Sequence, residues 1–153
     1  MTETHVILVS IDERFAAGLS EGRLAAIARR VLEAERAPAC ELSVTVTDDE
    51  TVRSLNREYA GEDEVADVLS FSQREGEEFV SQPEGAPQLG EVVIAYPQAA
   101  RQAGERGHTG AEEVTRLLVH GVLHLLGYDH AEPEEARRMR EREEALVEGT
   151  DAG

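Results

Sequence analysis

Lysine is absent from this chain of 153 residues, and all fifteen basic residues are arginines. Aspartate and glutamate together number 32, so the formal net charge at pH 7 is −17. Proteins that bind nucleic acids usually carry a basic surface, because contacts with phosphates dominate their affinity. The composition therefore disfavours capture of nucleic acid through a broad positive face. Any such contact must be local or must be completed by a partner.

Cysteine is nearly absent too, since Cys40 is the only one. A single cysteine excludes an internal disulfide and a structural zinc site built from several thiolates, and it fits a reducing compartment. The chain has no apolar run of roughly 18 residues, the length that spans a membrane. Its N-terminus has no basic region followed by an apolar signal core. These absences predict a soluble, cytoplasmic protein, and the length predicts a single domain over residues 1–153.

Apolar periodicity predicts four strands and five helices. The strands are expected at 5–11, 41–47, 68–72 and 89–95. The helices are expected at 20–35, from Asp48 or Asp49 to Tyr59, from Pro97 onward, at 112–126 and at 133–148. The fourth helix is apolar on almost every side and should be buried, whereas the densely charged fifth should be solvated. This order predicts an α+β domain with a mixed sheet of about four strands covered by helices.

Three of the five histidines fall in the run His-Gly-Val-Leu-His-Leu-Leu-Gly-Tyr-Asp-His at 120–130. A helix places His120 and His124 on one face, about 6 Å apart. Gly127 can adopt the left-handed conformation that ends a helix, which lets the chain bring His130 back toward them. A lone histidine on an apolar helix is usually a hydrogen-bonded core residue, but three imidazoles are typical of a catalytic zinc, whose fourth position holds water. We therefore expect one zinc ion per chain, although imidazoles also suit nickel, copper and iron.

The spacing His-x-x-x-His-x-x-Gly-x-x-His is also that of the metzincin peptidases, whose second motif residue is a glutamate that acts as general base. Here that residue is Gly121, which cannot accept a proton. A zinc peptidase or another metallohydrolase is therefore the second enzyme class to consider, with its metal scaffold present and its base missing.

Three blocks of the sequence resemble the YbeY family of bacterial endoribonucleases and rRNA maturation factors. They are the histidine run at 120–130, Leu-Gly-Glu-Val-Val-Ile at 89–94 and the segment from Leu55 to Phe71. The resemblance implies a zinc-dependent, single-strand-specific endoribonuclease that acts in rRNA maturation and ribosome quality control, with its zinc on His120, His124 and His130. It also implies an α+β sandwich with a metzincin-like metal site. The implied partners are single-stranded rRNA, ribosomal proteins and a ribosome-assembly GTPase.

Four polar residues of the matched blocks are candidates for the substrate groove: Asn56, Asp67, Ser70 and Glu91. Asp67 and Glu91 could accept a proton or orient a ligand imidazole, and each could instead be a strand-end cap or a surface charge. Asn56 and Ser70 could instead cap helices and bind backbone groups. The sequence assigns no residue a direct catalytic role.

The chain departs from the family pattern at Ala60, where the family has an arginine that is important for activity. The change removes a planar guanidinium suited to phosphate, for which Arg53 or Arg57 on the same helix could substitute. A local basic groove formed by these two arginines with Arg101 and Arg116 is a further expectation. The missing arginine and the acidic composition also keep a third hypothesis open, a non-catalytic ribosome-assembly factor that retains zinc for structure.

Overall fold

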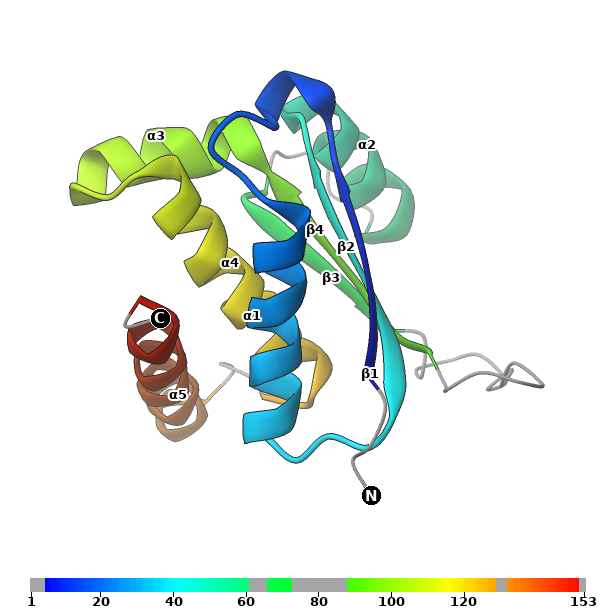
Figure 1. Cartoon of the computed structure of the whole chain (residues 1–153), viewed down its shortest axis with the longest axis vertical. Coiled ribbons are helices and arrows are strands. Elements are labelled where there is room, and N and C mark those ends of the chain that lie inside the picture. The colour runs from blue at the N-terminus through cyan, green and yellow to red at the C-terminus, as the bar shows by residue number, and fades with distance from the viewer. Residues whose placement is uncertain (1–4, 61–65, 73–87, 129–131, 152–153) are drawn as a thin grey trace.

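The computed structural model describes residues 5–60, 66–72, 88–128 and 132–151, and Figure 1 shows how their elements are arranged. The strands are β1 (His5–Ile11), β2 (Cys40–Thr47), β3 (Val68–Ser72) and β4 (Gln88–Ala95). The helices are α1 (Glu21–Ala34), α2 (Asp49–Ala60), α3 (Tyr96–Arg106), α4 (Gly110–Leu125) and α5 (Pro133–Asp151), with a 3-10 turn η1 at Glu13–Phe15. Each expected strand and helix is found, and its ends differ from the prediction by at most three residues.

The four strands form one mixed sheet in the order β1-β2-β4-β3. β1, β2 and β4 run parallel to one another, and β3 pairs antiparallel with β4 at one edge. A parallel pair needs a long crossover, and α1 supplies the one between β1 and β2. The α+β class and the mixed four-stranded sheet are thus confirmed.

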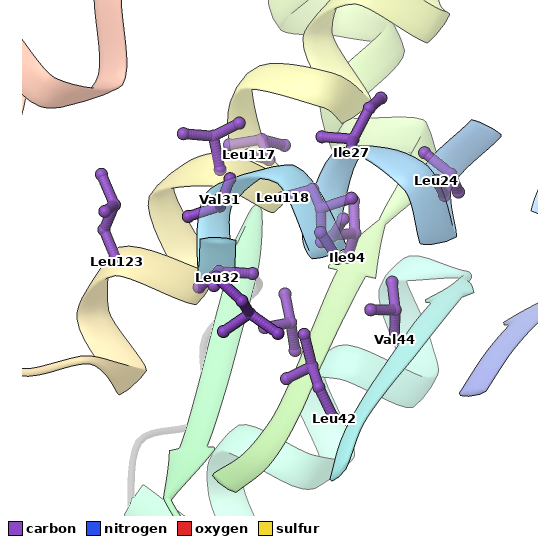
Figure 2. Close-up of a cluster of buried hydrophobic side chains, with 14 of the residues drawn as sticks. Leu24, Ile27, Val31, Leu32, Leu42, Val44, Ile94, Leu117, Leu118 and Leu123 are labelled. Carbon is purple, nitrogen blue, oxygen red and sulfur yellow. The ribbon is translucent and has the colours of Figure 1, made fainter. Parts of the chain in front are cut away.

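Helices α1 and α4 cover one face of the sheet, and the main core lies between them and the strands (Figure 1). Figure 2 shows Val31 and Leu32 of α1 and Leu118 of α4 in this cluster, together with Leu42 of β2 and Ile94 of β4. All five side chains are fully buried. Burial of a large apolar side chain contributes about 1.5–3 kcal/mol, so this layer fixes α4 firmly on the sheet.

Helix α2 covers the opposite face of the sheet through a smaller cluster. Val52 of α2 is buried there against Val93 and Ala95 of β4. Tyr59, seven residues after Val52 and so on the same face of the helix, lies at the rim of this cluster and is 66% exposed. Its ring centroid is 5.3 Å from that of Phe71 in β3. The apolar stripe of α2 is therefore shorter than its sequence pattern indicates.

The last two helices differ in burial. The buried position expected for α4 is confirmed, since nine of its sixteen residues are buried and its apolar side chains lie in the core. α5 is less solvated than its charge density predicts, because Met139 and Leu146 on its inner face are buried in the same core. No helix within the described ranges is both long and apolar enough to cross a membrane.

Candidate metal centre and substrate groove

The histidine pair lies in the last two turns of α4. The centroids of the His120 and His124 rings are 5.2 Å apart, and the ring planes meet at 72°. The helix is anchored at its start by a capping box between Thr109 and Glu112 and is held against the sheet along its apolar face. The two imidazoles therefore project from a rigid support, with the spacing that the sequence predicted.

A Schellman motif ends α4 after this pair. The Gly127 amide donates to the His124 carbonyl at 3.1 Å, and the Tyr128 amide donates to the Leu123 carbonyl at 3.1 Å. Gly127 has φ of +107°, so the left-handed conformation expected for it is confirmed. The Tyr128 hydroxyl donates to Glu35 at 2.6 Å, which ties the turn to the end of α1. The direction in which the chain leaves α4 is thus fixed from two sides.

The third expected ligand, His130, lies outside the described residues. In the part of the chain that is described, no group of three or more His, Cys, Asp or Glu side chains is arranged to hold a metal. The two described imidazoles fit a metal centre in chemistry and spacing, because they lie one helical turn apart on one face.

A carboxylate from α5 contacts the first histidine. Glu143 Oε2 lies 2.9 Å from His120 Nδ1, and the Glu143 side chain is only 15% exposed. The sequence predicted such a partner in Asp67 or Glu91 and did not point to Glu143. The available signal was the helical spacing of Met139, Glu143 and Leu146, which places the carboxylate on the same side of α5 as two apolar residues.

Gly121 occupies the motif position at which the peptidases have their glutamate base, and it faces the sheet. A Cβ atom at this position would lie 2.7 Å from Cγ1 of Val92 and 3.2 Å from Oγ of Ser70. The Ser70 hydroxyl also donates to the Gly121 carbonyl at 3.2 Å. Position 121 thus has no room for a glutamate, and its side-chain direction leads into β3 and β4.

The four groove candidates do not all lie on one face of the sheet. Ser70 lies under α4, as its hydrogen bond to Gly121 shows. Asp67, just before β3, accepts hydrogen bonds from the Val68 amide at 2.7 Å and from Gln102 of α3 at 3.1 Å. Asn56 is buried in α2.

Glu91 lies on the other face of the sheet. Its neighbours along β4, Gly90 and Val92, face Leu125 and Gly121 of α4, and alternate residues of a strand point to opposite sides. The Thr45 hydroxyl accordingly donates to Glu91 Oε2 at 3.2 Å on the α2 side. The sheet therefore separates Glu91 from the imidazoles, and the contact to an imidazole comes from α5 instead.

Two of the four arginines expected in a basic groove are already paired with acids. Arg101 of α3 donates to Asp49 of α2 at 2.8 Å. Arg116 lies one turn before His120 and donates to the buried Glu113 through Nε at 3.1 Å and Nη2 at 2.6 Å. Burial, the largest single effect, lowers the pKa of Arg116, but the hydrogen bonds to Glu113 and the negative charges of Glu113, Glu143 and Asp67 together outweigh it, so the net pKa is raised. Arg116 is thus a permanent cation close to the histidine pair.

These features define an α+β domain whose central helix presents a His-x-x-x-His pair beside a carboxylate. A family model described as endoribonuclease YbeY matches residues 11–151. Proteins named endoribonuclease YbeY are 48% identical over 111 residues in Desulforamulus reducens, covering 72% of both chains, and 44% identical over 147 residues in Chloroflexus aurantiacus, covering 94% of both. The chain belongs to the YbeY endoribonuclease family.

A solved structure shares the fold. The solution structure of TM1509 from Thermotoga maritima matches with a TM-score of 0.64 and 24% sequence identity, over 95% of this chain and 89% of that one. The similarity extends over almost the whole chain, so the two proteins share this fold.

Proposed function

We propose that this protein is a zinc-dependent endoribonuclease that cleaves single-stranded RNA during rRNA maturation and ribosome quality control. The observation that carries the proposal is the His120–His124 pair, which projects from a buried helix with its rings 5.2 Å apart. Membership of the YbeY endoribonuclease family supports RNA as the substrate. One zinc ion per chain would be held by His120, His124 and His130, in a site of the metzincin type.

When bound, zinc supplies Lewis acidity that makes water a stronger nucleophile near neutral pH and offsets charge on a phosphate. The chain's own residues hold and orient the reacting groups. α4 fixes the two imidazoles, and Ser70 ties that helix to β3 through the Gly121 carbonyl. Asp67, held by Gln102 and the Val68 amide, is our candidate proton acceptor on the substrate side.

The packing at Gly121 favours this function over a peptidase. A zinc peptidase with this motif uses a glutamate at that position as its base. Here a Cβ atom would already lie 2.7 Å from Val92, so the fold excludes the base for a steric reason. Cleavage of RNA also needs an acceptor for the proton of the attacking water or 2′-hydroxyl, and Asp67, outside the histidine motif, is our candidate for that role.

The partners that we propose follow from charge. A chain with a net charge of −17 repels the phosphate backbone at long range. Ribosomal proteins and a ribosome-assembly GTPase would bring the rRNA to the site and supply the positive charge that this chain lacks. Arg116, one turn before His120, would contribute a local guanidinium.

The test is cleavage of an end-labelled single-stranded RNA by zinc-loaded protein, with and without a chelator. His124→Ala should abolish cleavage, and His108→Ala serves as the matched control because His108 is exposed in the turn before α4. Thermal unfolding of the variants separates loss of the site from loss of the fold.

Three outcomes would contradict the proposal. Cleavage that survives both the chelator and His124→Ala would remove the metal from the reaction. Zinc-dependent turnover of casein with RNA untouched would favour the metallopeptidase. Protein that holds one zinc ion but leaves RNA intact would favour a non-catalytic assembly factor.

A further inference from the structure

Glu143 is one of only two charged residues on the inner side of α5 among the side chains described. Met139, four residues before it, and Leu146, three residues after it, are buried in the core. The other acids described in this helix are exposed. The second inner charge, Arg142, donates to Glu35 through Nε at 2.9 Å. Both charges that α5 turns inward therefore meet a specific partner.

Turning a carboxylate inward costs free energy unless a partner compensates it. For Glu143 the partner is His120 Nδ1, at 2.9 Å from Oε2. An ionised carboxylate can only accept hydrogen bonds, so Nδ1 carries the hydrogen in this contact. In that tautomer Nε2 has the lone pair that a metal requires. The contact thus selects the form of His120 that can act as a ligand through Nε2.

We propose that Glu143 is a positioning residue that holds His120 in the orientation and tautomer required for zinc. The inference rests on the proposed zinc site and deepens it. Carboxylates that accept from the distal nitrogen of a metal-bound histidine fix the ring and raise its basicity as a ligand. The C-terminal helix therefore contributes to the metal centre through the contact between Glu143 and His120, without supplying a ligand from its described residues.

The experiment compares Glu143→Gln with Glu144→Gln in the full-length protein. Glu144 is the neighbouring acid on the same helix, and it is exposed. Glutamine keeps the volume of the side chain, so the fold should be retained. The zinc dissociation constant is measured by competition with a chromogenic chelator. In the metal-free protein, nitrogen–proton NMR correlations report which ring nitrogen of His120 carries the hydrogen.

We expect Glu143→Gln to weaken zinc binding about 10- to 100-fold, with Glu144→Gln indistinguishable from the unsubstituted protein. We also expect the Nδ1–H form of His120 to dominate in the unsubstituted protein and to lose population in Glu143→Gln. In the background of His120→Ala, the same change should have no further effect on zinc affinity, because the residue through which Glu143 acts is gone.

Equal zinc affinity in Glu143→Gln and Glu144→Gln would overturn the inference. A lowered unfolding temperature with zinc affinity retained would do so as well, because Glu143 would then only hold α5 in place. Failure of the unsubstituted protein to bind zinc would instead overturn the proposed metal centre, and this inference with it. The two failures can be told apart. If the proposed metal centre is wrong, the unsubstituted protein does not bind zinc; if only this inference is wrong, the unsubstituted protein and Glu143→Gln bind zinc equally well.

Discussion

Replacement of Arg116 by methionine would leave the carboxylate of Glu113 in the core without its cation. The Glu113 side chain is 0% exposed and that of Arg116 is 26% exposed. Both hydrogen bonds of the pair end on Oε2 of Glu113, and Oε1 has no hydrogen-bond partner among the residues described. Methionine preserves the apolar stem of the arginine and removes only the guanidinium. The variant therefore isolates the cost of an unpaired buried carboxylate.

Removal of one partner from a buried ion pair typically costs 3–5 kcal/mol. Arg116 is partly exposed, so water can reach the vacated space, and we expect the lower end of that range, about 3 kcal/mol. For a domain of this size the corresponding fall in unfolding temperature is about 6–12 °C. The exposed pair Arg137–Glu134 has the same spacing of three residues, with side chains 58% and 66% exposed, and serves as the control. Arg137→Met should change stability by less than about 1 kcal/mol.

The assay is urea denaturation of the metal-free protein, with the double variant Glu113→Gln/Arg116→Met completing the cycle. Glutamine carries no charge, so the double variant should recover most of the stability lost in Arg116→Met. Equal losses in Arg116→Met and Arg137→Met would refute the reasoning. A double variant as unstable as Arg116→Met would also refute it, because the cost would then arise from packing and not from charge.

Three further changes test the packing and the caps around the site. Gly121→Ala places a Cβ atom 2.7 Å from Cγ1 of Val92 and should lower the free energy of unfolding, measured in urea, by about 1–3 kcal/mol. The same substitution at an exposed position of a helix would instead raise stability. Asp48→Ala should cost about 1 kcal/mol at pH 7. Hydrogen bonding, first from the Thr51 side chain, lowers the pKa of Asp48 from 3.8 to about 2, so this stability difference should shrink as the pH falls through that range. Tyr128→Phe removes the hydroxyl that donates to Glu35, the C-cap residue of α1, and should cost about 1–2 kcal/mol, whereas equal stability would show that the turn is held elsewhere.

Local patterns predicted the elements well because the signals for them lie within a few residues. Ser20 accepts from the Arg23 amide as the N-cap of α1, and Gly127 ends α4 in the left-handed conformation. For α2 the sequence offered two starting residues, Asp48 and Asp49, and in the structure the helix begins at Asp49, with Asp48 before it accepting from the Thr51 amide at 2.8 Å. Each of these signals depends on the backbone geometry of one turn.

The arrangement of the site was harder to predict, because it depends on contacts between residues far apart in the chain. The order β1-β2-β4-β3 decides which strands lie under α4, and no local pattern contains that order. The same applies to Glu91, whose place on the α2 side follows from the alternation of β4 once the position of α4 is known. The contact between His120 and Glu143 joins residues 23 positions apart, and the charge pattern of α5 suggested only a solvated helix.

The position of Gly121 explains how the same histidine spacing can occur both in a peptidase and in an endoribonuclease. In a helix, residues 120 and 124 share a face, whereas residue 121 points about 100° away from residue 120. Here that direction leads into Val92 and Ser70, so the close approach of α4 to the sheet and a glutamate base at this position exclude each other.

Proton transfer must then depend on groups outside the motif. Besides the buried Glu113, Asp67 and Glu143 are the carboxylates whose charges act on Arg116, one turn before His120. Because Glu143 is engaged by His120, Asp67 is the one that an activity assay should test first, with Asp67→Asn expected to lower the cleavage rate while leaving zinc binding unchanged.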